Sequence, residues 1–271
     1  RPAPFQTFLV TGGTDGVNGP ATADVTIMLV STESAETSTA SPLLRQMTTP
    51  RAFHTATQLD DGRVLIAGGV DASGNALKTT EIYDPFTRTT AAGPTLLTAR
   101  AKHSAVLLSS GDVAFFGGIG AGDAVLTSCE VYNFTPADDP HVANAALPPL
   151  PIGQHTLQAI LLPDQRVLVT GGIDASGNPV TDAVAFDPLN DNTPVTPTTK
   201  DPEFQDVGDM LEARAYGSAT RLLSGNVLFA GGAARVEVSR IDGVFPMLFA
   251  FFVYGGIFAI AQSFFLATQL G

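Results

Sequence analysis

An apolar run that ends in a pair of glycines recurs five times along this chain, and no other feature constrains the fold as strongly. The five runs are FLVTGG, RVLIAGG, DVAFFGG, RVLVTGG and NVLFAGG, and they end at Gly13, Gly69, Gly118, Gly172 and Gly232. Successive pairs are therefore 56, 49, 54 and 60 residues apart. A period of this length is typical of folds in which similar small sheets stack beside one another.

Each repeat has the pattern of several short β-strands. Ahead of four of the glycine pairs lies another strand-like run, and a tight turn such as DDG at 60–62 separates the two runs. A turn-rich segment follows the pair, DASGN at both 71–75 and 174–178, and then a third strand-like run such as KTTEIYDP, which ends at Pro85. We expect the glycine pair to end a strand where backbones pack closely and φ is positive.

A Pro-rich passage with room for a fourth short strand leads from each repeat to the next. A single four-stranded sheet cannot bury both of its faces, so units of this size are expected to stack around an axis. DDGRVLIAGGVDASGNALKTTEIYDP at 60–85 and DQRVLVTGGIDASGNPVTDAVAFDP at 164–188 resemble the kelch β-propellers. The resemblance is strongest to the bacterial form, in which D-G-R-V-L-V-x-G-G-x-D-x-S-G-N precedes E-x-Y-D-P.

This resemblance spans roughly residues 5 to 242. It implies an all-β, kelch-like propeller of about five blades in a domain at 1–243, with unit boundaries near residues 46, 97, 149 and 211. The family usually places a Trp after the third strand, whereas this chain has none, so Phe and Leu are expected to fill the contacts between blades. The first repeat begins at its second strand, and the fifth has at most a third strand, RVEVSRID at 235–242. At least one terminal blade should therefore be incomplete.

The last 28 residues, 244–271, carry no charged side chain, whereas the 243 residues before them carry all 40. As a helix, residues 247–267 would reach roughly 30 Å, which is the hydrocarbon thickness of a bilayer. A buried pair of strands around the Gly255-Gly256 pair is the alternative. We expect a single C-terminal transmembrane helix at 244–271, with a face toward partner helices that carries Gly255, Gly256, Gln262 and Ser263.

Basic side chains recur just ahead of the first strand of the repeats. His54, His103 and His155 are read as one repeated position, and Arg51, Arg100 and Arg214 stand three residues ahead of that position in their repeats. In the kelch propellers the loop before the first strand lines one mouth of the central channel. These six residues are therefore either a partner-binding mouth for an anionic group or acidic segment, or repeated hydrogen bonds between blades.

The sequence offers little support for catalysis, a metal or a cofactor. Symmetry-related histidines of a propeller are too far apart to share one zinc ion, and each DASGN has one Asp, which suits a turn better than a calcium loop. Cys129 and Tyr132 allow a copper-radical oxidase as a remote alternative, but only four His are present. Phosphate loops, nucleophile elbows and H-E-x-x-H motifs do not occur.

The net charge of the chain limits the kinds of partner that it is expected to bind. The net charge is −12 and the pI is about 4.5, and without clustered Lys and Arg the chain is not expected to bind nucleic acid. We therefore expect a non-enzymatic, membrane-anchored propeller that is an accessory or scaffold subunit of a larger membrane protein complex. The chain would cross the bilayer once, with the propeller periplasmic or extracellular. An exported propeller that recognises peptide or glycan is the alternative.

Overall fold

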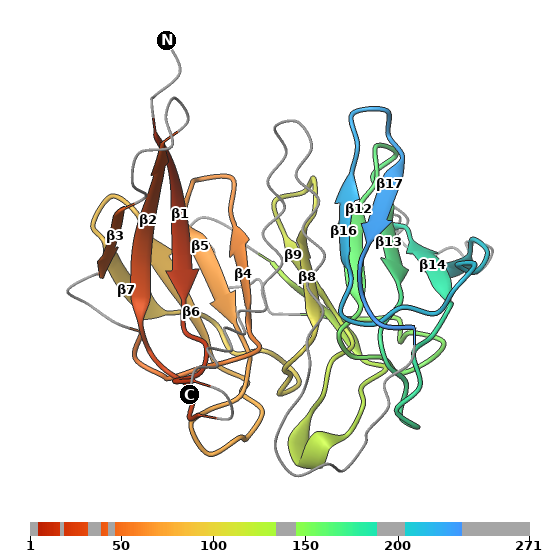
Figure 1. The fold of residues 1–271 in the computed structure, drawn as a ribbon, viewed down its shortest axis with the longest axis horizontal. Helices are drawn as coiled ribbons and strands as arrows, with labels where there is room; N and C mark the ends of the chain where they lie inside the picture. Colours follow the sequence, from red (N-terminus) through yellow and green to blue (C-terminus); the bar gives the residue numbers. More distant parts are fainter. Residues whose placement is uncertain are drawn as a thin grey trace, which may run out of the picture.

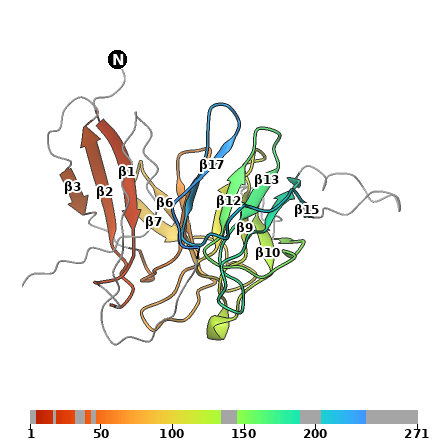
Figure 2. The same cartoon turned by 45° about the vertical axis from the view of Figure 1, so that its right-hand side comes forward.

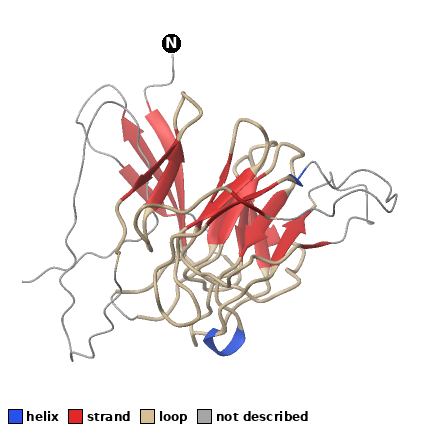
Figure 3. Ribbon diagram, turned by 90° about the vertical axis from the view of Figure 1, so that its right-hand side faces the viewer, coloured by secondary structure: helices blue, strands red, loops and turns tan. Residues whose placement is uncertain are grey.

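The structure is a computed structural model that describes residues 5–16, 19–31, 39–42, 47–133, 145–188 and 204–234. In these residues the chain forms five antiparallel sheets and one short 3-10 helix, η1 (Ala121–Asp123). Figure 3 shows the strands gathered in separate sheets that are joined by long loops, with η1 among the loops at the lower end. The predicted all-β architecture is confirmed for this part of the protein.

The sheets follow one another in chain order. The first consists of β1 (Phe5–Thr11), β2 (Val25–Ser31) and β3 (Thr39–Pro42). The second consists of β4 (Thr55–Gln58), β5 (Val64–Ala67), β6 (Thr80–Asp84) and β7 (Thr89–Ala92). The third consists of β8 (Ser104–Leu107), β9 (Val113–Phe116), β10 (Cys129–Tyr132) and β11 (Ala145–Leu147). The fourth consists of β12 (Gln158–Leu161), β13 (Val167–Thr170), β14 (Ala183–Phe186) and β15 (Gln205–Asp206), and the fifth of β16 (Ser218–Arg221) and β17 (Val227–Ala230).

The first strands of neighbouring sheets lie side by side. β4 contacts β8, β8 contacts β12, and β12 contacts β16, so the sheets fan outward from a shared line of inner strands (Figures 1 and 2). Within the described residues, and as expected from the sequence, the first sheet starts at β1 and the fifth sheet has two strands. Within the same residues no helix is long and apolar enough to cross a membrane. The helix expected at 244–271, with its contact face, lies outside the described part of the chain.

The antiparallel order gives the molecule two different ends. The turns that join first and second strands, at 59–63, 108–112, 162–166 and 222–226, lie at one end, here called the hairpin face (upper in Figure 1). The opposite end, here called the loop face, holds the segments that precede the first strands and those that follow the glycine pairs. The loop face comprises residues 47–54, 68–79, 98–103, 117–128, 150–157, 171–182 and 210–217.

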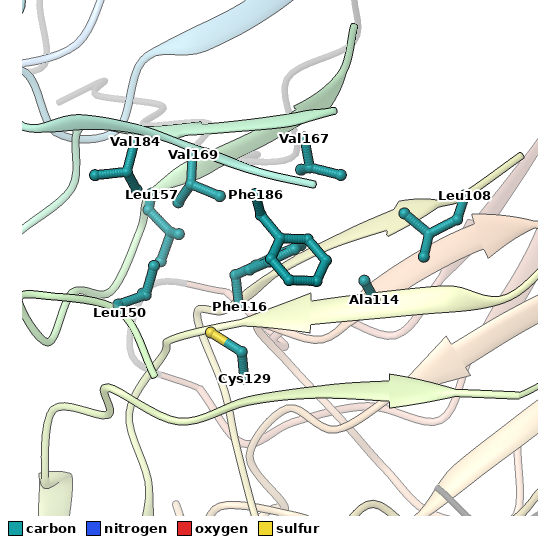
Figure 4. Packing of buried hydrophobic residues seen from close by; sticks show 10 residues of the cluster. All are labelled: Leu108, Ala114, Phe116, Cys129, Leu150, Leu157, Val167, Val169, Val184 and Phe186. Carbon is teal, nitrogen blue, oxygen red and sulfur yellow. The ribbon is translucent and has the colours of Figure 1, made fainter. Parts of the chain in front are cut away.

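Aliphatic and Phe side chains fill the spaces between sheets, as expected for a chain without Trp. The largest cluster joins the third and fourth sheets (Figure 4) and consists of Leu108, Ala114, Phe116, Cys129, Leu150, Leu157, Val167, Val169, Val184 and Phe186. The Phe116 and Phe186 rings meet edge to face with centroids 6.0 Å apart, a favoured aromatic geometry. Smaller clusters around Phe115 and around Met47 and Tyr83 join the preceding sheets.

The glycine pairs form the contact between one sheet and the next. Gly68 and Gly69 have φ of 63° and 95°, and a Cβ on Gly68 would collide with the Arg100 carbonyl and the His103 ring of the third sheet. The Gly69 N–H donates to the Arg100 carbonyl at 2.9 Å. The same bond recurs from Gly13 to Arg51, from Gly118 to Gln154 and from Gly172 to Arg214. The positive φ and close backbone approach expected from the sequence are both present.

Candidate functional site

Arg51 is enclosed in a network that holds the loop before β4 against β6. Its Nη2 donates to Glu81 Oε1 at 2.9 Å, and its Nη1 donates to the carbonyls of Gly68 and Thr79 at 2.8 and 3.0 Å. The Glu81 carboxylate also accepts the backbone N–H groups of Thr48 and Thr49 at 2.7 and 3.1 Å. Both side chains are essentially unexposed, at 0% and 2%.

Arg100 repeats this network one sheet later. Its Nη2 and Nε donate to Glu130 Oε1 at 2.7 and 2.9 Å, and its Nη1 donates to the carbonyls of Gly117 and Ser128. The other Glu130 oxygen accepts the Leu97 N–H. Charge-assisted bonds of this kind are strong and geometrically specific. The two arginines are therefore part of the internal frame and have no exposed surface for a partner.

His54 and His103 bridge neighbouring sheets. His54 Nε2 lies 2.8 Å from Thr11 Oγ1 of the first sheet, and His103 Nε2 lies 2.9 Å from Thr55 Oγ1 of the second. Burial, together with the Arg51 charge, lowers the pKa of His54 to about 4. Burial and the Arg100 charge lower the pKa of His103 well below its usual range. Both rings are neutral at pH 7 and make the repeated hydrogen bonds that the sequence allowed as one interpretation.

His155 does not occupy the position of His54 and His103, which corrects the alignment made from sequence. Single bridges pair Ala52 with Val70, Ala101 with Ile119, and His155 with Ile173. His155 is thus equivalent to Ala52 and Ala101, and Leu157 takes the place of the two buried histidines. Gln154 takes the place of Arg51 and Arg100 in this repeat. The sequence therefore offers no arginine from which the equivalent of His54 could be counted.

Arg214 matches Arg51 and Arg100 in position but is more exposed. Its Nη1 donates to the Gly231 carbonyl at 3.0 Å, as the other two arginines donate to Gly68 and Gly117. Its Nη2 contacts the nearby Glu212 at 3.0 Å, and the Arg214 side chain is 35% exposed. Among the six residues considered from sequence, Arg214 is therefore the arginine that solvent reaches.

A further candidate site consists of four exposed or half-buried residues that sequence reasoning missed. Phe53, Lys102, Thr156 and Tyr216 each precede the first strand of successive sheets, with φ of 56°, 52°, 56° and 60°. The Lys102 N–H donates to the Phe53 carbonyl at 2.9 Å, and the Thr156 N–H donates to the Lys102 carbonyl at 2.8 Å. These four residues are here called the loop-face row.

The side chains of the loop-face row present two aromatic rings and a cation. Phe53 and Tyr216 are 51% and 53% exposed, and Lys102 Nζ lies 5.3 Å from the centroid of the Phe53 ring. A left-handed conformation costs a non-glycine residue on the order of 1 kcal/mol, and such strain gathers at functional sites. The sequence signal was a large side chain directly ahead of His54, in A-F-H, and of His103, in A-K-H.

A pocket of about 480 Å³ adjoins Phe53 between the first two sheets. Its described lining is Thr14, Gly19, Pro20, Ala21, Ala52, Phe53, Val70, Asp71, Ala72 and Gly74. Asp71 Oδ1 accepts the N–H groups of Ser73 and Asn75 at 2.8 and 2.9 Å. Asp174 makes the equivalent bonds in the fourth sheet. Both DASGN segments therefore have the turn structure expected of them.

The groups considered for metal chemistry lie apart from this row. Within the described chain, no three or more His, Cys, Asp or Glu side chains are placed to hold a metal ion. Cys129 lies in the apolar cluster between the third and fourth sheets (Figure 4), and burial raises the pKa of its thiol to about 11. Burial also raises the pKa of Tyr132 to about 12. A protonated thiol and phenol are poor metal ligands.

Comparison with known proteins supports the fold. No protein-family model matches the chain, and no curated protein matches it. Among solved structures, the structure of YjhT is similar, with a TM-score of 0.63 and 14% sequence identity over 83% of this chain and 74% of that one. At this identity the likeness bears on the fold alone. The protein has an all-β, β-propeller-like fold.

Proposed function

We propose that this protein is a non-enzymatic, kelch-type propeller, anchored in a membrane by its C-terminal segment, that acts as an accessory or scaffold subunit of a larger membrane protein complex. The loop-face row is the observation that carries the proposal. It places the exposed Phe53 and Tyr216 rings and the partly buried Lys102 side chain on a frame that is held by the Arg51–Glu81 and Arg100–Glu130 pairs. Aromatic side chains such as Tyr are common anchors of protein interfaces.

The chemistry of the row supports binding. An aromatic ring beside an ammonium group offers apolar area and one positive charge, which suits a partner with an apolar, acidic surface. His54 and His103, which follow Phe53 and Lys102 in the sequence, are buried, and burial lowers the pKa of both rings so that they are neutral near pH 7. The uncharged stretch 244–271 supports the membrane anchor, and the exported character of similar bacterial repeats supports a periplasmic or extracellular propeller.

A ligand-binding module for peptide or glycan is the second candidate, and the pocket beside Phe53 favours it. The pocket of about 480 Å³ is of the size that small ligands occupy. An exposed ring at its rim provides a stacking surface for a sugar or an apolar peptide side chain. This candidate shares the loop face with the first, so the same variants address both.

The test compares two double variants of the full chain, purified in detergent from membranes. Phe53→Ala with Tyr216→Ala removes the aromatic groups of the loop-face row. Phe86→Ala with Leu223→Ala removes two exposed apolar side chains, 86% and 108% exposed, from the turns of the hairpin face. We expect the first variant alone to lose the co-purifying subunits, with unchanged circular dichroism. Retention of those subunits, or equal loss in both variants, would refute the proposal.

A further inference from the structure

The buried arginine of the second and third sheets is replaced by a glutamine in the fourth sheet. Gln154 stands at the equivalent position, because its carbonyl accepts the Gly118 N–H just as the Arg100 carbonyl accepts the Gly69 N–H. The Gln154 side chain therefore starts from the same point of the fold as the arginine side chains. It enters the fourth sheet as they enter the second and third.

The glutamate of the network is also missing from the fourth sheet. Glu130 lies opposite Phe115, two residues before the first glycine of its pair, and Val184 lies opposite Val169 at the same distance from the next pair. Val184 thus takes the glutamate position. The fourth sheet has neither charge of the ion pair that its two predecessors contain.

The two arginine networks show what a cation contacts at this place. The Nη1 group donates to the carbonyl of the first glycine of the pair, Gly68 at 2.8 Å and Gly117 at 2.6 Å. The Nη2 group donates to the hydroxyl groups of Thr79 and Ser128 at 3.3 and 3.2 Å. A backbone carbonyl and a side-chain oxygen therefore both face the guanidinium group.

The fourth sheet presents oxygen atoms at the same place. Gly171 is equivalent to Gly68, and Asp182 is equivalent to Thr79, because the N–H of each glycine donates to the carbonyl of its partner at 3.3 and 3.1 Å. Gln154 is 3% exposed, and its buried Oε1 accepts no hydrogen bond from the described residues. A buried oxygen without a donor is costly, and such atoms often mark a bound water or ion.

The charge at this place favours a cation. In the second and third sheets the charges of arginine and glutamate cancel, whereas the fourth sheet retains a carboxylate on Asp182. Burial and the charges of Asp209 and Asp206 raise the pKa of Asp182 above its ordinary value. A carboxylate among charges of its own sign is stabilised by a nearby cation.

We propose that the fourth sheet binds one calcium ion where the second and third sheets hold a guanidinium group. The ligands are Gln154 Oε1, the Gly171 carbonyl and the Asp182 carboxylate, and water completes the six to eight oxygens, roughly, that Ca²⁺ accepts. The Asp182 backbone carbonyl is not needed, because it accepts the Thr170 hydroxyl at 3.0 Å. With one carboxylate ligand the dissociation constant should be on the order of 10⁻³ M.

This site differs from one built of three or more acidic, His or Cys side chains, which the described chain does not contain. The bound ion joins the segment before β12 to the start of β14, as the guanidinium groups do in the two preceding sheets. That segment also carries Thr156, two residues after Gln154. Calcium therefore fixes one member of the loop-face row.

The test is thermal unfolding of the full chain in detergent, followed by circular dichroism with EGTA or with about 10 mM calcium chloride. We expect calcium to raise the melting temperature by several degrees, as a ligand at about ten times its dissociation constant should. Calorimetric titration should show one site. Magnesium, which gives up its water reluctantly, should have a smaller effect. No shift with calcium, or an equal shift with magnesium chloride, overturns the proposal.

Three variants locate the ion. Asp182→Asn should lose the calcium shift. Gln154→Arg supplies a guanidinium group, so its melting temperature in EGTA should rise and calcium should add nothing. Asp174→Asn is the matched control on the same sheet, where Asp174 Oδ1 accepts the N–H groups of Ser176 and Asn178 at 2.9 and 2.8 Å, and it should keep the full shift.

A full calcium shift in Asp182→Asn, or its loss in Asp174→Asn alone, would place the ion elsewhere and overturn the proposal. If Gln154→Arg does not fold, the titration of Asp182→Asn decides, since this variant should bind calcium at least tenfold more weakly than the unaltered chain. Equal affinity in the two proteins would overturn the site. These measurements need neither a membrane nor a partner, so their outcome is independent of the proposed function.

Discussion

At the scale of single residues, the groups of the described sheets whose burial costs most free energy of hydration are the ion pairs Arg51–Glu81 and Arg100–Glu130. Arg100 and Glu130 are 0% and 1% exposed, and each is surrounded by backbone groups that complete its hydrogen bonds. A charge in such a place is tolerated because its partner is present. Replacing one member of such a pair should therefore destabilise the fold far more than the small change in side-chain shape implies.

We expect Glu130→Gln to lower the free energy of unfolding by about 3 kcal/mol, because Arg100 would stay buried without a counter-charge. Urea unfolding followed by circular dichroism measures the effect. Asp61→Asn is the matched control, since Asp61 pairs with Arg63 at 2.7 Å but both side chains are 33–41% exposed. Exposed pairs contribute about 1 kcal/mol or less. Similar losses in the two variants would contradict this account.

Acid should destabilise the protein through its buried histidines. The pKa of His54 is about 4 in the fold against 6.5 ordinarily, so between these values the unfolded chain binds more protons than the folded one. Stability is therefore full above pH 6.5 and falls as the pH decreases toward 4, by up to about 3 kcal/mol for this residue. Unfolding measured at several pH values should show a shallower decline in His54→Gln. An unchanged decline would show that His54 is not responsible.

At the scale of elements, the strands and turns whose structure depends on residues close in the sequence could be predicted from the sequence. The glycine pairs, the DDG turn and the DASGN turns all appear where their local chemistry placed them. The features that were missed depend on contacts between sheets. The register of His155 is set by its bridge to Ile173, and the exposure of Phe53 and Tyr216 is set by a positive φ that their side chains do not signal.

Substitutions at two glycines of the second sheet should distinguish the effect of backbone strain from the effect of steric crowding. Gly69 and Gly74 both have positive φ, at 95° and 85°, but a Cβ on Gly69 would collide with Ala52 and His54, whereas a Cβ on Gly74 would meet nothing within 4 Å. Gly74→Val should lower the free energy of unfolding by about 1–2 kcal/mol through strain alone. Gly69→Val should lower it by more than about 1 kcal/mol beyond that. Equal losses in urea unfolding would show that crowding at the glycine pair is unimportant.

At the scale of the whole molecule, each sheet is held mainly by the sheets next to it. The apolar clusters and the bonds from each second glycine join consecutive sheets, so we expect the described sheets to stay folded without the uncharged segment that follows Asp242. The acidic excess of 26 over 14 basic residues also favours solubility once that segment is absent. Fold and membrane attachment should therefore be separable.

Truncation after Asp242 tests this separation, because it removes residues 243–271 and with them the whole uncharged segment. We expect the shortened protein to leave the membrane fraction and to appear as a soluble, folded propeller. The reason is that the uncharged segment, which is long enough to span a bilayer, has been removed. Sedimentation of cell fractions measures the change, and circular dichroism with urea unfolding shows whether the sheets persist. If the truncated protein sediments with membranes as the full chain does, the anchor lies elsewhere, and the scaffold role in a membrane complex loses its support.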